Sequence, residues 1–258
     1  MKRWHLFEFH ELDRCPQLVR QLLTGFLEYV SGLFRAYSPK IDLLIVALRS
    51  AQTNRFVDLC SGDGGPWFGL AGEIQQRLGH PVSVVLTDKY PSSEAKRRAQ
   101  SACGIEYCAD PVDARMVPIE LPGVRTLFNG FHHFQPQEAE AILQDAVAKQ
   151  QPIAIFELLQ RNWINLLQTL FVPVSVLFLT PLLRPLTWSR LLMTYVIPVA
   201  PLMLFWDGTI SVLRCYRPDE LLAMASGLEG PPYHWESGCY WQRGAPVTYL
   251  IGYPLETK

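Results

Sequence analysis

The sequence has no Cys-x-x-Cys pair and no histidine spacing that would complete a metal-binding pattern. Zinc sites and disulfide-rich secreted domains both depend on paired or regularly spaced cysteines. We therefore expect reduced thiols in a cytoplasmic protein and no metal site. The six cysteines stand singly, at Cys15, Cys60, Cys103, Cys108, Cys215 and Cys239.

An excess of charge of either sign is also missing. The 23 Lys and Arg residues balance 24 Asp and Glu residues, for a formal net charge of -1. This balance offers no electrostatic reason to expect a nucleic-acid partner. The N-terminus lacks the continuous apolar run of a secretory signal, and the chain shows no internal repeat.

One stretch, from Arg55 to Trp67, combines a short apolar strand, an acid and a turn of small residues that opens a helix. Glycine in such a turn permits positive φ and lets a ligand approach the backbone. Pro66 removes an N–H donor where a pyrophosphate would need one, and Trp67 stands where the dinucleotide fingerprint requires glycine. No Gly-Lys-Ser/Thr follows, so the P-loop is excluded as well.

An acid followed by a glycine turn resembles the first motif of class I S-adenosylmethionine-dependent methyltransferases. Asp58 matches the acid, and Gly62 and Gly64 match two of the turn glycines. Cys60, followed by Ser61, stands where the motif usually has its first glycine. The resemblance implies S-adenosyl-L-methionine as cofactor, with these five residues around it.

Periodicity predicts alternating helices and strands along the rest of the chain. Expected helices cover 16–36, 39–51, 66–78, 94–102, 136–149 and 217–225. Expected strands cover 55–59, 81–87, 105–108, 124–128, 152–157, 233–236 and 247–253, with a Gly- and Pro-rich turn between the last two.

Together with the resemblance, this order implies an α/β three-layer sandwich. Its mostly parallel seven-stranded sheet has an antiparallel C-terminal strand. We expect a single methyltransferase domain, 1–258. It divides into an N-terminal helical cap (1–54), a cofactor-binding core (55–157), an apolar helical insertion (158–210), and a C-terminal helix with closing strands (211–258).

Polar residues follow the predicted strands at the edge where open α/β sheets bind ligands. Asp88 ends the second strand, where an acid can accept hydrogen bonds from ribose hydroxyls; capping of the next helix is the alternative. Lys89 and, after the fourth strand, Asn129 are further cofactor candidates. Asp113 and Ala114 resemble the methyltransferase segment whose acid approaches the adenine amino group, although Asp110 competes for that role.

Candidates for handling the methyl acceptor follow strands four and five. His132 and His133 could remove a proton, and Glu157 could orient the base or bind a cationic acceptor. Adjacent residues usually point apart, so we expect at most one of the histidines to face the site. Helix capping or packing by these three residues is the alternative. Trp206-Asp207-Gly208 closes the insertion, and Asp-Gly is typical of a tight turn.

The insertion carries no charge from Ile164 to Leu183, long enough as a helix to span the ~30 Å apolar part of a bilayer. A second apolar run, 191–205, follows Arg184 and Arg190. Because the sheet resumes afterwards, a single crossing is excluded. Three interpretations remain: a two-helix crossing, a hairpin in one leaflet, or a lid or homodimer surface through 164–205. The last is favoured.

The sequence therefore predicts an enzyme that transfers a methyl group to a small acceptor with apolar or amphipathic surface, roofed by the insertion. We expect it in the cytoplasm, with association to the inner face of a membrane left open. Two alternatives remain: an NAD(P)-dependent oxidoreductase of the same topology, and a non-catalytic membrane-docking or partner-binding protein that retains the cofactor fold.

Overall fold

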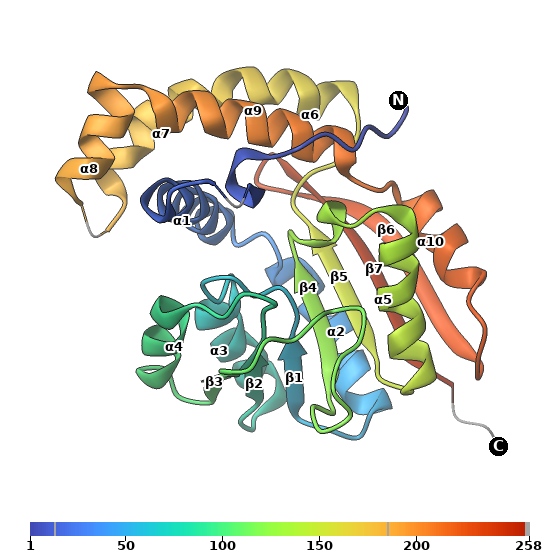
Figure 1. The fold of residues 1–258 in the computed structure, drawn as a ribbon. Coiled ribbons are helices and arrows are strands. Elements are labelled where there is room, and N and C mark those ends of the chain that lie inside the picture. The colour runs from blue at the N-terminus through green and yellow to red at the C-terminus, as the bar shows by residue number, and fades with distance from the viewer. Residues whose placement is uncertain (13, 185, 256–258) are drawn as a thin grey trace. The chain divides into compact units, whose positions relative to one another are not determined.

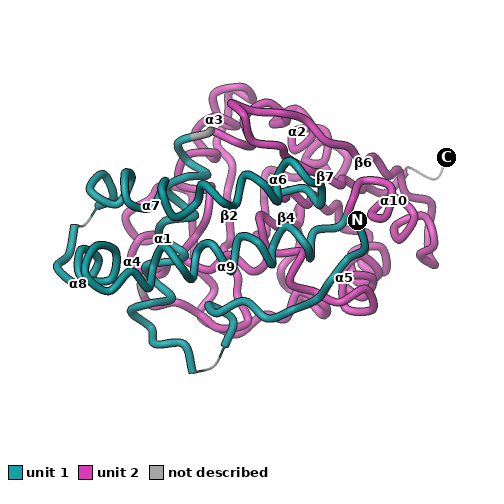
Figure 2. The backbone as a smooth tube through the Cα atoms, turned by 90° about the horizontal axis from the view of Figure 1, so that it is seen from above, with its two compact units in different colours: residues 1–34, 159–216 teal, residues 35–158, 217–258 magenta. Residues whose placement is uncertain are grey.

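The computed structural model describes residues 1–12, 14–184 and 186–255. Contacts divide the chain into two compact units, shown in Figure 2. Unit 1 contains residues 1–34 and 159–216, and unit 2 contains residues 35–158 and 217–258. The predicted N-terminal cap is thus shared between the units. Position 185 of the predicted insertion lies outside the described residues.

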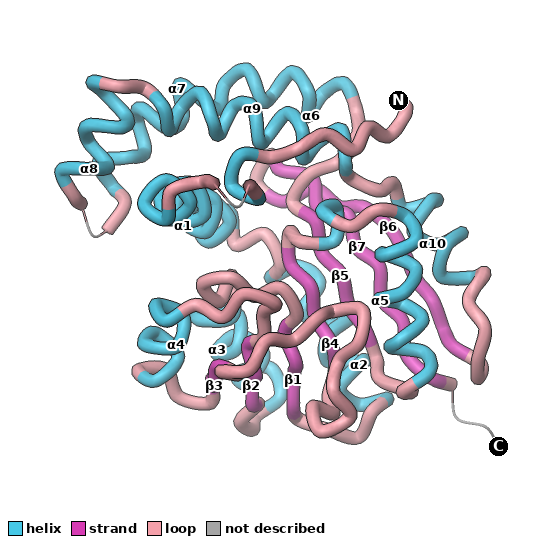
Figure 3. Tube along the Cα trace, in the orientation of Figure 1, coloured by secondary structure: helices cyan, strands magenta, loops and turns pink. Residues whose placement is uncertain are grey.

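Unit 2 is built on a seven-stranded sheet with the order β3-β2-β1-β4-β5-β7-β6. Figure 3 shows the strands in magenta. The first five strands are parallel, and β7 runs antiparallel to both of its neighbours. This confirms the predicted fold class. The strands are β1 (Arg55–Asp58), β2 (Ser83–Leu86), β3 (Ile105–Tyr107), β4 (Val124–Phe128), β5 (Ile153–Glu157), β6 (Tyr233–Gln242) and β7 (Ala245–Pro254).

Helices cover both faces of this sheet. Figure 1 shows α5 in front of the sheet and α2 behind it. The helix α2 packs on β4, β5 and β7 and also touches α3, while α10 packs on α5 and β6. Their bounds are α2 (Ile41–Ser50), α3 (Trp67–Leu78), α4 (Ser93–Gln100), α5 (Pro136–Ala148) and α10 (Pro218–Ser226), close to the predicted ranges.

Aromatic side chains form the core on one face of the sheet. Phe128 and Phe156 are register partners on β4 and β5, and their rings stack with centroids 5.5 Å apart. Trp67, the first residue of α3, is fully buried against Phe56 (4.7 Å) and Phe128 (5.8 Å). Stacked and edge-on aromatic pairs of this kind add to the energy of burial alone. The start of α3 is therefore anchored on the ends of β1 and β4.

The last two strands are longer than predicted, and the expected Gly- and Pro-rich turn between 236 and 247 is reduced to two residues. The hairpin turns at Arg243 and Gly244, both with positive φ, as a two-residue β-turn requires. Gly238 and Gly252 lie inside the strands, where a side chain would not fit. A Cβ at Gly238 would lie 2.8 Å from Tyr249, and a Cβ at Gly252 would lie 2.1 Å from Trp235. These glycines accommodate aromatic rings from the facing strand; they do not mark the turn.

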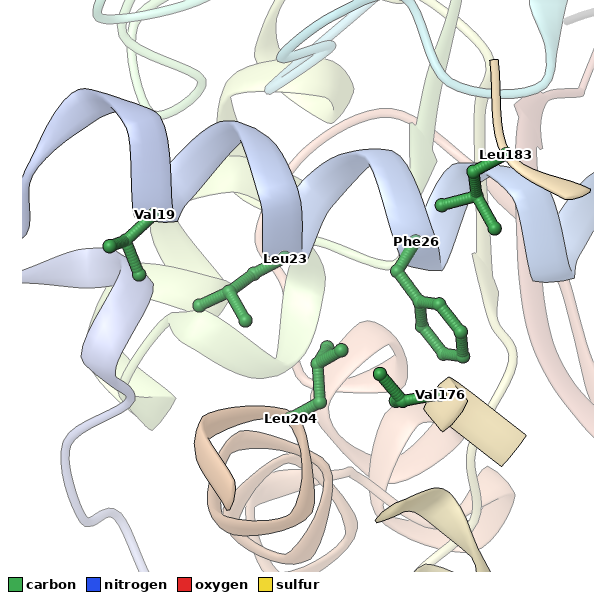
Figure 4. Close-up of a cluster of buried hydrophobic side chains, with 6 residues drawn as sticks. All are labelled: Val19, Leu23, Phe26, Val176, Leu183 and Leu204. Atoms are coloured by element: carbon green, nitrogen blue, oxygen red, sulfur yellow. The ribbon is translucent and has the colours of Figure 1, made fainter. Parts of the chain in front are cut away.

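Unit 1 is helical, as predicted for residues 16–36 and for the insertion. Its core joins Val19, Leu23 and Phe26 of the first helix to three residues of the insertion, Val176, Leu183 and Leu204 (Figure 4). The helices are α1 (Gln17–Phe34), α6 (Trp163–Gln168), α7 (Val172–Leu179), α8 (Trp188–Leu191) and α9 (Val199–Arg214). Short 3-10 segments (Thr169–Phe171 and Thr180–Leu182) and a π-helical segment (Leu192–Val196) connect them.

The N-terminal segment is tied to α9 by Asp207, so the tight turn predicted at Asp207 is wrong. Asp207 lies inside α9 and is buried; its carboxylate accepts hydrogen bonds from the backbone N–H of Phe9 (2.7 Å) and from His10 Nδ1 (3.0 Å). The nearest oxygen of Glu8 lies 3.6 Å from the same ring nitrogen. Asp207 thus holds a segment about two hundred residues distant in sequence.

These contacts place His10 next to two carboxylates, which favour its protonated form. Burial lowers the pKa of His10, but the hydrogen bond to Asp207 and the charges of Glu8, Asp207 and Glu11 outweigh it and raise the pKa. The ligand atoms of Glu8, His10 and Asp207 lie within 4.8 Å of one another, a spacing that could hold a metal ion. Arg214, 3.2 Å from Glu8, already supplies positive charge there.

We predict that His10→Gln lowers the free energy of unfolding of unit 1 by about 1–3 kcal/mol in mild acid, because a charged hydrogen bond is lost. The native pKa is raised above the ordinary value of 6.5. The contribution is therefore complete below that value and declines as the pH rises through the native pKa. Denaturant unfolding across this range measures it, with the exposed His80→Gln as control. A difference that stays constant with pH would contradict the prediction.

Candidate functional site

The candidate site lies in unit 2, at the carboxyl ends of β1, β2, β4 and β5. Asp58, the last residue of β1, is buried and pairs in register with Thr126 of β4. Thr126 Oγ1 donates a 2.7 Å hydrogen bond to the Asp58 carboxylate. Burial raises the pKa of Asp58 to about 6, against the opposing effect of its hydrogen bonds. The motif acid is therefore held within the sheet edge by a neighbouring strand.

The turn after Asp58 is left-handed at several positions. Cys60 (φ 55°), Gly62 (φ 51°), Gly64 (φ 101°) and Gly65 (φ 49°) all have positive φ. This geometry explains why the methyltransferase motif favours glycine where this chain has Cys60. A non-glycine residue held in this region stores backbone strain, a feature that is common at functional sites.

Space above the turn is open, while its underside is closed. A Cβ added to Gly62 would meet nothing within 4 Å, whereas one on Gly64 would lie 2.4 Å from the ring of Phe68. Ser61 is buried and holds the turn to the end of β2: its Oγ donates to the backbone oxygen of Asp58 (2.9 Å) and accepts from the N–H of Thr87 (3.1 Å). The turn of residues 60–65 is therefore a cradle that is closed towards Phe68 and open at Gly62.

Asp88 joins this cradle from the end of β2. One carboxylate oxygen accepts the N–H of Gly62 and the other accepts the N–H of Tyr90, each at 2.8 Å. Partial burial raises the pKa of Asp88. A carboxylate offers about four acceptor directions, so these two bonds leave capacity for ligand hydroxyls. The predicted ribose acid lies against the predicted cofactor turn.

The predicted adenine segment lies beside Asp88 as well. The N–H of Val112 donates to the backbone oxygen of Asp88 (2.9 Å), and Ala114 is buried. Arg115 binds both carboxylate oxygens of Asp113, at 2.9 and 2.6 Å, and lowers its pKa to about 2. The Lys89 ammonium lies 3.7 Å from the same carboxylate. Asp113 is thus ionised and fixed in orientation.

Asn129 follows β4 in a left-handed conformation (φ 52°), and both ends of its side chain are engaged within unit 2. Its Oδ1 accepts the N–H of Leu158 (2.7 Å), and its Nδ2 donates to the hydroxyl of Tyr37 (2.7 Å). Burial raises the pKa of Tyr37 well above its ordinary value, so this phenol stays neutral. Asn129 fixes the ends of β4 and β5 through these bonds.

His132 and Glu157 form a buried pair at the ends of β4 and β5. Glu157 Oε1 accepts the N–H of Phe131 (2.7 Å), and Oε2 lies 2.5 Å from His132 Nδ1. Burial raises the pKa of Glu157, but the charges and hydrogen bonds of His132, His133 and Phe131 outweigh it and lower the pKa. Because an ionised carboxylate only accepts, His132 Nδ1 is the donor. In the neutral form of the ring, Nε2 is then the atom with a lone pair.

The two histidines lie side by side, with ring centroids 4.1 Å apart, although adjacent residues were expected to point apart. They occupy a 3-10 turn (Phe131–His133), in which side chains do not alternate as they do on a strand. His132 is buried and His133 is half-buried. A carboxylate, an oriented imidazole and a second imidazole can together accept a proton and stabilise the resulting charge.

Sequence reasoning did not identify Thr126, Thr87 or Tyr37 as parts of this edge. Thr87 is fully buried and donates from Oγ1 to the backbone oxygen of Asp58 (2.8 Å). A threonine inside or after an apolar strand carries no distinctive signal. Tyr37 precedes the sheet in sequence and meets Asn129 only through folding.

Comparison with known proteins finds no matching family model and no matching curated sequence. Among solved structures, the pyocyanin biosynthetic protein PhzM matches with a TM-score of 0.54 and 14% identity, over 96% of this chain and 62% of that chain. Human N-acetylserotonin methyltransferase in complex with SAM matches at 0.49 and 12% identity, over 92% and 56%. PigF with SAH matches at 0.49 and 13%, over 93% and 67%.

The likeness to PhzM shows the fold: this chain has the class I methyltransferase fold expected from its sequence. The chain covers less than two thirds of the length of PhzM and of the human enzyme.

We predict that Glu157→Gln reverses the tautomer of His132. The single amide oxygen of glutamine would serve the two backbone N–H groups of Phe131 and His132, which turns the amide NH₂ towards His132 Nδ1. Nδ1 must then accept, and the proton moves to Nε2. Imidazole ¹⁵N chemical shifts measure this change, and His133→Gln is the control that should leave it unaltered. Unchanged Nδ1 protonation in Glu157→Gln would refute the assigned hydrogen bond.

Proposed function

We propose that the protein is an S-adenosylmethionine-dependent methyltransferase. The observation that carries this proposal is the left-handed turn from Cys60 to Gly65 joined to Asp88 through the N–H of Gly62. It lies at the ligand-binding edge of a sheet with the methyltransferase strand order. The pyocyanin biosynthetic protein PhzM shares this fold.

Residues of unit 2 suit the three parts of this cofactor. Asp88 would accept hydrogen bonds from the ribose hydroxyls, and Asp113 with Ala114 would meet the adenine edge. The space next to Gly62 is open, so the backbone there would be accessible to the methionine part of the cofactor. The other residues expected around the cofactor are Asp58, Cys60, Ser61, Gly64, Lys89 and Asn129.

Trp67 distinguishes this proposal from an oxidoreductase with the same topology. Its side chain points into the core, fully buried, where the dinucleotide fingerprint would place glycine for close helix-to-strand packing. Pro66 precedes it and offers no N–H. The start of α3 therefore lacks one of the N–H donors that a pyrophosphate would use.

Bound S-adenosyl-L-methionine would supply an electrophilic methyl group on a sulfonium. His132 would take the proton from an acceptor hydroxyl at Nε2, while Glu157 accepts from Nδ1–H and balances the imidazolium charge. Glu157 therefore positions the base and stabilises its charged form, and His133 adds a second imidazole next to it.

The acceptor is a small molecule with apolar or amphipathic surface in this proposal. Its support is connectivity and composition: the apolar insertion begins at Leu159, two residues after Glu157, the carboxylate that positions the proposed base. We place the activity in the cytoplasm, as the isolated positions of the cysteines along the sequence suggest.

Calorimetric titration of the whole protein with S-adenosylmethionine and S-adenosylhomocysteine tests the cofactor. We expect both to bind. Asp88→Ala should raise the dissociation constant about 10–100-fold, because hydrogen bonds from the ribose hydroxyls to the carboxylate are lost. Asp88→Asn should raise it less, since it keeps an acceptor towards Gly62. Asp42→Ala, at an exposed carboxylate of the same unit, is the matched control.

Two results would refute the proposal. One is that neither S-adenosylmethionine nor S-adenosylhomocysteine binds. The other is that these compounds do not bind but NADH quenches the fluorescence of the protein in a saturable way. Transfer of labelled methyl to a panel of phenols and quinols then tests the acceptor class. His132→Ala should abolish that transfer while leaving S-adenosylhomocysteine binding intact.

A further inference from the structure

We propose that unit 1 docks on an anionic lipid bilayer, with the exposed apolar sides of α6, α7, α8 and the start of α9 immersed in one leaflet. The inference concerns unit 1 alone and goes beyond the proposed methyl transfer. Either can fail without the other.

The helical run from Trp163 to Leu182 is long and apolar enough to cross a membrane, with a mean hydropathy of 1.7, yet only 22% of that window is buried. A soluble core helix of such composition would be mostly covered. The exposed large apolar residues of this run are Trp163, Ile164, Leu167, Leu170, Phe171, Val174, Leu177, Phe178 and Leu182.

The helix α7 shows the mismatch most clearly. Its sequence, Val-Pro-Val-Ser-Val-Leu-Phe-Leu, is apolar on every side, but only Val176 is buried. Helices that are apolar all round lie in a protein core or in lipid. Phe178 on the outer side is 75% exposed. This side of α7 requires an apolar environment that the described part of unit 1 does not supply.

Aromatic residues extend the surface into the following helix. Trp188 at the start of α8 is 86% exposed, and Tyr195 and Trp163 are also exposed. Trp and Tyr side chains are enriched at the level of lipid headgroups, where an apolar ring and a polar tip are both satisfied. Their positions indicate a bilayer boundary.

The charged residues of this surface favour anionic lipids. Between Trp163 and Trp206 the only charged residues are Arg184 and Arg190, and there is no acid. Arg184 is exposed, and an arginine near an anionic leaflet is attracted by its negative surface potential. In a two-fold contact between copies, the same surface would meet itself and offer Arg184 no carboxylate from this stretch. A bilayer with anionic headgroups therefore fits better than a second copy.

A crossing is disfavoured by what packs on α7. Val176, in the second half of the run, shares a core with Phe26 and Leu23 of α1. The helix α1 carries Arg20 and Glu28, which a crossing would draw into hydrocarbon at high cost. The second apolar pair of helices, Trp188–Val196 and Val199–Arg214, bends by 76°. The amphipathic arrangement of unit 1 suits a position in the plane of one leaflet.

Sedimentation of the whole, detergent-free protein with vesicles tests the proposal. Vesicles of phosphatidylcholine with about one third phosphatidylglycerol should bind the protein, and pure phosphatidylcholine should bind less, because of the surface potential. The double variant Phe171→Ser, Phe178→Ser should reduce partitioning at least about tenfold. The matched control is Met116→Ser, Ile119→Ser, at two similarly exposed apolar residues of unit 2. Arg184→Gln should reduce the preference for phosphatidylglycerol.

Depth is measured by quenching with brominated lipids, using Trp188→Phe to isolate the emission of Trp188. We expect quenching by bromines near the headgroup end of the chains. Three results would overturn the proposal: no sedimentation with either vesicle; a dimer in buffer that the double phenylalanine variant dissociates, without vesicle binding; or quenching at the bilayer centre with resistance to carbonate extraction, which indicates a crossing.

Discussion

The hydrogen bond from the N–H of Gly62 to Asp88 is the contact on which the candidate site depends. It joins the turn after β1 to the end of β2, and it requires the left-handed backbone that begins at Cys60. Below it, Asp58 is held by Thr126 of β4. The ends of three parallel strands are thus connected through one turn. Those connections form the cradle at this edge of the sheet.

A second connection, between His132 and Glu157, continues the same edge to β5. Parallel strands end on one side of a sheet, so the turn after β1, the end of β2 and the His132–Glu157 pair at the ends of β4 and β5 belong to the same edge. Glu157 is buried and accepts three hydrogen bonds, from Phe131 and His132. In the proposed function, this pair provides the oriented base.

Unit 1 is held together by a small apolar core and by buried polar contacts. Its small core, centred on Phe26, Val176 and Leu204, uses only part of the apolar surface that its helices carry. Asp207, Glu8 and Arg214 add a buried polar network that attaches the N-terminal segment to α9. The insertion therefore gains its fold from polar anchoring as much as from packing, and a large apolar surface remains outside its core.

The sequence by itself determined the parallel core, the turn at Asp58 and the placement of Asp88. These features follow from local constraints: strand periodicity, and positive φ at the glycines of one short loop. Only the tertiary structure decided that Asn129 meets Tyr37, that Asp207 binds the N-terminal segment, and that the last hairpin turns at Gly244. Each depends on partners distant in the chain or on the facing strand, and such pairings leave no local pattern.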